Sequence, residues 1–320
     1  MNDINSVLPC REKLALRARL YQQLREFFSQ RGVLEVETPI FSEAGNTDPT
    51  IASITSNFSS DPEKNQIRFA HTSPEFAMKR LLARGSGSIY QICKVFRCEE
   101  RGDLHSPEFT MLEWYRVGLN YHELMQEITE LFSFLGIATE IEKVSYAEVF
   151  EQYLSIDVLN ANVSDLKVCA QKHDLDVVGF TNDYDLWAAF LLSSLIEPHL
   201  GGDKPVFVYD FPASQAALST IRVADNVCER FELYFKGIEL ANGYQELLHA
   251  QEYQFRFEKD NVKRKLSGFN EIPWDKRLIS ELMSGIPNTS GVALGLDRLI
   301  MIMAEQTNID SVMAIKYSEA

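Results

Sequence analysis

The sequence is short of positive charge, of paired cysteines and of long apolar runs, and each shortage argues against a class of protein. Its 31 Lys and Arg residues face 46 Asp and Glu, a net charge of −15, which would repel a polyphosphate. This disfavours a tRNA substrate, although a local basic surface could still bind one. The five cysteines are widely spaced and form no Cys-x-x-Cys pair, which indicates reduced thiols in a cytosolic protein. Because no basic-then-apolar leader and no apolar run of about 18 residues occurs, we expect a soluble, cytoplasmic protein.

The chain also lacks Pro/Ser-rich linkers, internal repeats and low-complexity tracts. We therefore expect one domain over residues 1–320, and the 45% of hydrophobic residues can fill one large core centred on a sheet. Residues 145–200 contain no chemical motif and predict a mostly helical insertion. Its short amphipathic runs lie near 146–154, 164–173 and 184–197.

The N-terminal part alternates helices with short extended segments. Apolar periodicity predicts a helix over residues 11–31, ended by Gly32, and a strand over 33–38. Residues 43–66 are rich in polar and turn-forming residues and predict a loop, which a short strand over 67–70 follows.

A second helix is predicted from the residues that follow this strand. Ser73 suits the N-cap position, with a proline at the first helical position and Glu75 in the first turn. Glu75 either complements the helix dipole or binds a ligand. The helix should reach about residue 83, with Lys79 and Arg80 solvated. A further helix is predicted over 121–136.

The most informative stretch covers residues 88–118, which predict two strands joined by a polar loop that contains His105. Side chains alternate along each strand with period 2. The residues expected on one face of the first strand are Ile89, Gln91, Cys93, Val95, Arg97 and Glu99, and those expected on one face of the second are Phe109, Met111, Glu113 and Tyr115. A half-solvated antiparallel sheet would show a similar alternation, but arginine, glutamate and aromatic groups aimed at one surface suit a charged, planar ligand.

A second hairpin is predicted over residues 230–247, after an apolar strand at 205–212. Glu232 lies on its first strand and Glu239 on its second, with a Lys-Gly turn between them. The pair could be two exposed acids, or could hold Mg²⁺, which commonly bridges protein carboxylates and nucleotide phosphates. The polar residues that alternate on the second strand are Asn242, Tyr244 and Glu246.

Together these segments resemble the lysyl-type class II aminoacyl-tRNA synthetases. Residues 96–115 resemble motif 2, with Phe-Arg-x-Glu, a loop with histidine, and Pro-Glu-Phe-x-x-Leu-Glu-Trp-Tyr. Residues 11–39 resemble motif 1, and 239–246 resemble Glu-x-Ala-Asn-Gly-aromatic-x-Glu. Residues 290–298 resemble the glycine-rich motif 3, although Ala293 replaces its middle glycine. Within this family the chain resembles free-standing paralogues of the catalytic domain, which attach (R)-β-lysine to a lysine of elongation factor P.

The resemblance implies a fold and an assembly. It implies an α+β fold, with an antiparallel sheet flanked by helices, and a homodimer formed through residues 11–39. Since only ten residues precede the first predicted helix, we expect no anticodon-binding domain.

It also implies a set of site residues. Those implied to bind ATP are Arg97, Glu99, His105, Phe109, Glu232, Glu239 and Arg298, with Mg²⁺ on Glu232 and Glu239. Those implied to bind the amino acid are Ser73, Glu75, Glu113, Tyr115, Asn242, Tyr244, Glu246 and Ala293. The catalytic roles fall to Arg97, Arg298 and His105.

Adenylate formation explains why such residues are needed. Two anions must meet, the substrate carboxylate and the α-phosphate of ATP, and the planar fork of Arg97 can bind both. Glu113 and Glu246, with Tyr115, are expected to form a cage for a distal ammonium, while Glu75 serves the amino group nearer the carboxylate. These acids predict a diamino acid as the substrate.

The sequence therefore predicts ATP-dependent activation of lysine or (R)-β-lysine and its transfer to a lysine of elongation factor P. The alternatives are a truncated lysyl-tRNA synthetase that charges tRNA and a non-catalytic sensor of an amino acid or nucleotide. We further expect the methyl group of Ala293 to disfavour α-lysine relative to β-lysine. Alternatively, alanine is simply tolerated in a turn whose dihedral angles do not demand glycine.

Overall fold

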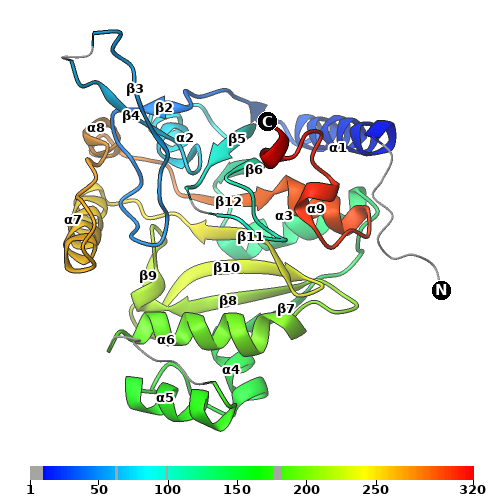
Figure 1. Ribbon diagram of the computed structural model, residues 1–320, viewed down its shortest axis with the longest axis vertical. Coiled ribbons are helices and arrows are strands. Elements are labelled where there is room, and N and C mark those ends of the chain that lie inside the picture. Colours follow the sequence, from blue (N-terminus) through cyan, green and yellow to red (C-terminus); the bar gives the residue numbers. More distant parts are fainter. Residues whose placement is uncertain (1–9, 62–63, 99, 176–181) are drawn as a thin grey trace. The chain divides into compact units, whose positions relative to one another are not determined.

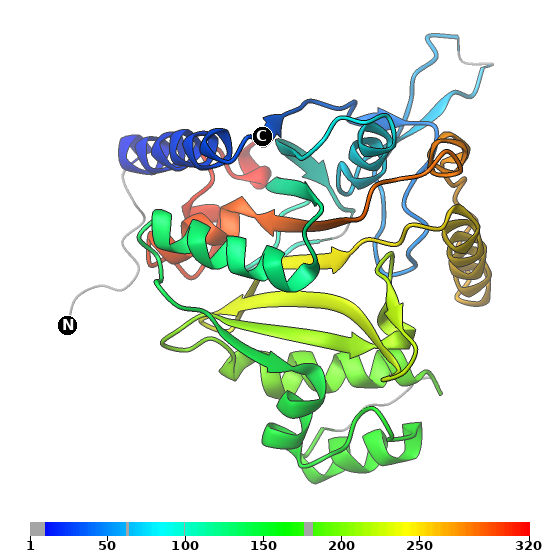
Figure 2. The same cartoon turned by 180° about the vertical axis from the view of Figure 1, so that it is seen from behind.

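The computed structural model describes residues 10–61, 64–98, 100–175 and 182–320. They form two compact units (Figures 1 and 2), and each unit is built around β-strands. Unit 1 comprises Met1–Asn120 and Leu247–Ala320, and unit 2 comprises Tyr121–Glu246. No helix in the described ranges combines the length and the apolarity that a membrane crossing requires.

The central strands of unit 1 run in the order β1-β5-β6-β12. They are β1 (Leu34–Glu35), β5 (Ile89–Phe96), β6 (Glu108–Val117) and β12 (Thr289–Gly295). β5, β6 and β12 are antiparallel neighbours, whereas β1 is parallel to β5. A separate small sheet has the order β2-β4-β3 and is made of β2 (Phe41–Ser42), β3 (Thr55–Asn57) and β4 (Ile67–Ala70).

Five α-helices accompany the strands of unit 1 in its described residues. They are α1 (Cys10–Gln30), α2 (Glu75–Ala83), α7 (Ala250–Leu266), α8 (Lys276–Leu282) and α9 (Leu296–Met303). One stripe of α1 is buried, as its periodicity predicts, and Gly32 follows it with φ +66°. Short 3₁₀ turns follow at Ile309–Ser311 and Tyr317–Glu319. Figure 2 shows α2 beside α8, and the two helices are in contact.

The strands of unit 2 run in the order β11-β10-β8-β7, with β9 paired to β10. They are β7 (Glu142–Ser145), β8 (Val206–Pro212), β9 (Ile221–Arg222), β10 (Val227–Phe235) and β11 (Ile238–Gln245). β8, β10 and β11 are antiparallel, and β7 is parallel to β8. The helix α3 (Tyr121–Phe134) buries the stripe that its sequence predicts.

Helices of the predicted insertion cover part of this sheet in unit 2 (Figure 1). They are α4 (Tyr146–Leu154), α5 (Val163–Lys172) and α6 (Tyr184–Leu191), after which come a π-helical turn (Leu192–Ile196) and a 3₁₀ turn (Glu197–His199). Reciprocal side-chain and backbone bonds between Ser145 and Glu148 begin α4. Helix and strand side chains share one apolar core, in which Phe150, Trp187 and Phe211 are buried.

The predicted α+β class is confirmed, and most strand pairs are antiparallel as expected. Two details differ from the sequence prediction. The strand expected over 33–38 is only two residues long, and the loop expected over 43–66 contains β3. The parallel pairings of β1 and β7 were not predicted, because short strands leave little periodicity in the sequence.

Candidate active site

In unit 1, three adjacent strands carry the predicted amino-acid ligands on one face. Glu113 of β6 lies directly opposite Gln91 of β5 and Ala293 of β12. Because directly opposite residues point to the same side of a sheet, these three side chains share one face. Tyr115 lies two residues further along β6 and therefore on the same face.

Glu113 is the centre of a hydrogen-bonded group on this face. Its carboxylate is 2% exposed and accepts hydrogen bonds from Tyr115 Oη and from Ser73 Oγ, both at 2.6 Å. Ser73 Oγ in turn accepts a hydrogen bond from the backbone N–H of Glu75 at 3.0 Å. The structure thus brings together four residues that the sequence assigns to the amino-acid site.

The start of α2 differs slightly from its prediction. Pro74, not Ser73, occupies the N-cap position, and α2 begins at Glu75. Ser73 bonds instead to the first helical N–H and to Glu113, so its hydroxyl joins the helix start to the sheet.

The predicted solvation of Lys79 and Arg80 is wrong. Lys79 is fully buried, and its Nζ lies 2.6 Å from Glu75 Oε1. Arg80 is half-buried and bonds to Glu281 of α8 at 2.9 Å. Helical periodicity alone could not show this, because α8 comes from a distant part of the sequence and covers what would otherwise be an exposed face.

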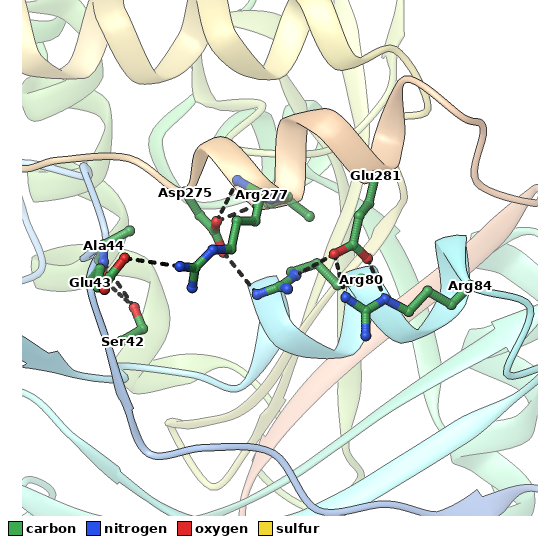
Figure 3. A network of polar contacts seen from close by, with 9 residues as sticks. Ser42, Glu43, Ala44, Arg80, Arg84, Asp275, Arg277 and Glu281 are labelled. Carbon is green, nitrogen blue, oxygen red and sulfur yellow. Dashed lines mark hydrogen bonds and ion pairs between the residues drawn. The ribbon is translucent and has the colours of Figure 1, made fainter.

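The outer face of α2 is held by a network of ion pairs, drawn in Figure 3. Glu281 accepts bonds from both Arg80 and Arg84, at 2.9 and 2.7 Å. Asp275, at the start of α8, lies 3.8 Å from Arg80. Several arginine–carboxylate contacts therefore fix the position of the helix that carries Glu75.

Arg97 retains unused hydrogen-bonding capacity. Its guanidinium lies 5.2 Å from the centre of the Phe109 ring and makes one long contact with Glu100, at 3.5 Å. Arg97 Nε is buried and makes no hydrogen bond to any described residue. A guanidinium with an unused buried donor suits an anionic ligand. Glu99, predicted to bind adenine, lies outside the described residues.

Arg298 and His105 are neighbours. Arg298 Nε donates to the carbonyl oxygen of Leu104 at 3.1 Å, and its Nη2 lies 2.9 Å from His105 Nε2. Burial, and then the positive charge of Arg298, lower the pKa of His105. His105 is therefore neutral at physiological pH and can accept a bond from Arg298.

Asp297 is a supporting residue that the sequence analysis missed. It is 1% exposed and accepts a bond from Arg17 of α1 at 2.5 Å and one from the backbone N–H of Thr110 at 2.6 Å. It thereby joins α1, β6 and α9 beside Phe109 and Arg298. In the sequence, the only indication of this role was that Asp297 directly precedes the predicted site residue Arg298.

In unit 2, the predicted hairpin and its Lys-Gly turn are confirmed. β10 and β11 pair with Glu232 opposite Asn242 and with Tyr234 opposite Glu239. The register shifts between these pairs, so that Leu240 is an extra residue on β11. This bulge turns Glu239 to the face that carries Asn242, which strict alternation would forbid.

Glu232 and Glu239 line the same cavity of about 390 Å³ within unit 2. The Glu232 carboxylate accepts hydrogen bonds from Arg230, from Tyr234 Oη at 2.5 Å and from Asn242 Nδ2 at 3.0 Å. Burial raises the pKa of Glu232, the charge of Arg230 opposes this shift, and the charge of Glu239 adds to it. No group of three or more potential metal ligands occurs in the described part of the chain.

The remaining predicted residues of unit 2 follow Glu239 in the sequence. Tyr244 is half-buried and lies on β11. Glu246 is 1% exposed and comes directly after the last residue of β11, where it forms an isolated bridge with Ser219. The cage that would combine Glu246 with Glu113 and Tyr115 stays a prediction, because its members belong to different units.

Comparison with known proteins defines the family. The family model "tRNA synthetases class II (D, K and N)" matches residues 7–316, and the chain belongs to this family. The predicted class of enzyme, an ATP-dependent ligase of the class II synthetase type, is thereby confirmed.

The similar proteins include a group of ligases with one name. The chain is 47% identical over 306 residues to the elongation factor P (R)-β-lysine ligase of Histophilus somni, covering 95% of this chain and 94% of that protein. It is 45% identical over 311 residues to the ligase of the same name from Pasteurella multocida, covering 97% and 96%. The corresponding protein of Haemophilus influenzae is 44% identical over 306 residues, with coverage of 95% and 94%.

Proposed function

We propose that this protein activates lysine or (R)-β-lysine with ATP as an aminoacyl-adenylate and transfers it to a lysine side chain of elongation factor P. The observation that carries the proposal is the 47% identity, over almost the full length of both chains, to a ligase of that name. The grouping of Ser73, Glu113 and Tyr115 in unit 1 supports it, because these are three of the residues that the family resemblance assigns to the amino-acid site.

The first step joins the substrate carboxylate to the α-phosphate, with pyrophosphate as the leaving group. Arg97 would hold both anions and reduce their repulsion, and its unused Nε supports this role. Phe109 would stack on adenine with the ring face that Arg97 does not cover, and Arg298 and His105 would meet the phosphates. No side-chain nucleophile is required, because the substrate supplies its own carboxylate.

The expected Mg²⁺ would neutralise phosphate charge. Glu239 fits this ion, since Mg²⁺ is often bound through one or two carboxylates together with substrate phosphates. Glu232 fits it less well, because three hydrogen bonds from its own unit already occupy its carboxylate.

The acceptor separates the proposal from the two alternatives. A tRNA-charging enzyme would have to bind a polyanion with a chain of net charge −15, whereas a lysine on a basic protein surface would be attracted to it. An acceptor of this kind, a translation factor, would place the reaction in the cytoplasm. A sensor would bind ligand without turnover.

The decisive experiment incubates the protein and ATP with labelled α-lysine or (R)-β-lysine and with either elongation factor P or tRNA. We expect label on elongation factor P and ATP–pyrophosphate exchange with a lysine isomer. Label on tRNA alone would establish the tRNA enzyme, and the absence of exchange with every isomer would leave the sensor.

The proposal includes a homodimer formed through residues 11–39. The exposed side of α1 leaves room for a partner, since residues such as Leu14 are 46% exposed. Analytical ultracentrifugation at micromolar concentration should give a dimer, and a monomer would refute this part.

A further inference from the structure

Lys79 is a buried cation at the centre of α2. Its side chain is 0% exposed, its Nζ donates to Glu75 Oε1 at 2.6 Å, and its Nζ lies 5.1 Å from the ring centre of Tyr253. A lysine ammonium loses strong hydration when it is buried, so it is retained only where a partner compensates. Glu75 provides that partner one helical turn away.

Glu75 has one oxygen occupied and one available. Lys79 holds Oε1, and no described residue donates a hydrogen bond to Oε2. The Glu75 side chain is 21% exposed, so a ligand can reach it. Its backbone N–H is bound by Ser73, whose hydroxyl donates to Glu113.

We propose that Lys79 is a positioning residue, which fixes the Glu75 carboxylate so that Oε2 receives the substrate amino group nearer the carboxylate. The inference rests on the proposed function and deepens it, because it assigns the selection of that amino group to a pair of residues. A carboxylate with free rotation would accept an amino group at several positions. A carboxylate whose other oxygen is held in place accepts the amino group at a single position. Recognition of one lysine isomer requires this, because the isomers differ in the position of that amino group.

The rest of α2 does not depend on Lys79 for its position. The contacts of Arg80 and Arg84 with Glu281 hold the outer face of the helix against α8 (Figure 3). Lys79→Met should therefore release the Glu75 carboxylate while the helix stays in place. Methionine has a similar length and no charge to leave unpaired. Arg84→Met, which alters only the outer network, is the matched control.

The test measures ATP–pyrophosphate exchange for the full-length protein with (R)-β-lysine and α-lysine. For Lys79→Met we expect KM for the preferred isomer to rise by about tenfold or more, which corresponds to the loss of one charge-assisted contact. The kcat and the KM for ATP should change less than about threefold. The inhibition constant of 6-aminohexanoate, which lacks the inner amino group, should stay within about threefold of wild type. Arg84→Met should match wild type in all these values.

A purely structural role for Lys79 would give a different result. It would weaken lysine and 6-aminohexanoate equally, and that outcome, or an unchanged KM for lysine, would overturn the inference. If the wild-type protein exchanges with no lysine isomer, the proposed function itself fails, and the inference falls with it. These results are distinguishable, because only the last concerns the wild-type protein.

A double-mutant cycle keeps the test valid if Lys79→Met folds poorly. Glu75→Gln/Lys79→Met leaves neither charge unpaired and is compared with Glu75→Gln alone. If Lys79 acts through Glu75, the two variants should have KM values for lysine within about threefold of each other. A further loss of about tenfold in the double variant would show that Lys79 acts independently and would refute the inference.

Discussion

Two buried cation–carboxylate pairs, one in each unit, differ in what they leave available. In unit 1, Glu75 bonds through one oxygen to Lys79 and keeps the other open. In unit 2, both oxygens of Glu232 are occupied by Arg230, Tyr234 and Asn242. Both acids were predicted as ligand-binding residues, Glu75 for the amino acid and Glu232 for Mg²⁺ with ATP.

The difference shows that a carboxylate predicted to bind a ligand can instead stabilise the fold. In unit 1 the Glu75 carboxylate keeps Oε2 open, which suits a substrate cation. The pair in unit 2 is saturated, and its main effect should be on stability, with Asn242 held in place as a result. The first two predictions below separate an available charge from a saturated one, and the last two test features that involve no ion pair.

Arg97→Ala should have the largest effect, because Arg97 has a buried Nε without a hydrogen bond and only one long ionic contact, so it can bind anions. We expect ATP–pyrophosphate exchange to fall by at least about 10²–10³-fold, to background, since a charge that bridges two anions is lost. Glu246→Ala is the comparison variant and should chiefly raise KM for the amino acid. Near-normal exchange by Arg97→Ala at ordinary substrate levels would contradict the assignment.

Arg230→Met should act on stability. Removing one partner of a buried pair leaves Glu232 uncompensated and should lower the free energy of unfolding by about 3–5 kcal/mol. The urea midpoint followed by circular dichroism measures this loss. Arg230→Met/Glu232→Leu should recover part of it, and Lys204→Met, which breaks an exposed pair with Glu140, should change little. An unchanged midpoint with impaired ATP use would make the pair a ligand site instead.

Ala293→Gly tests size in place of charge. Ala293 lies opposite Glu113, so its methyl group points to the same face of the sheet. We expect exchange with α-lysine to rise and the isomer preference to narrow by about 10–200-fold at most, the effect of one methyl group in a close-fitting pocket. The isomer ratio from paired exchange assays measures this. A folded, active variant with the parental ratio would show that the methyl group is not the selector.

The smallest effect should come from His71, a half-buried group that makes no ion pair with a described residue. Its Nε2 donates to the carbonyl oxygen of Lys94 at 2.7 Å, while Nδ1 is buried and makes no hydrogen bond. Burial lowers the pKa of His71, and the bond to Lys94 opposes the shift. Because the unfolded state then binds the proton more readily, the contribution of His71 to stability is present above the unfolded pKa and is lost as the pH falls through the folded one.

Unfolding free energies measured near pH 7.5 and near pH 5.5 should therefore differ, with the lower value at acidic pH. His71→Gln should reduce that difference, since glutamine does not titrate. An NMR titration that placed the folded pKa of His71 at or above that of free histidine would contradict the prediction.

Much of the fold could be predicted from periodicity. α1, α2, α3 and α4 begin and end within two residues of their predicted limits, because each buries a single apolar stripe. The bulge at Leu240 could not be predicted, since β10 and β11 would show the same alternation without it. The burial of Lys79 near Tyr253 and the ion pair of Arg80 with Glu281 involve residues far away in the sequence, which a local pattern does not contain.

The sequence by itself determined the family, the order of its motifs and the kinds of side chain available for an adenylate-forming reaction, because these depend only on residue identity and spacing. The tertiary structure decided which of those side chains remain available. Lys79 occupies one oxygen of Glu75, and Arg230, Asn242 and Tyr234 together occupy both oxygens of Glu232. These donors are close in sequence, on the same helix, the same strand or the neighbouring strand of the hairpin. What the sequence does not show is that Lys79 and Glu232 are buried, so that their charges bond to neighbouring side chains and not to water.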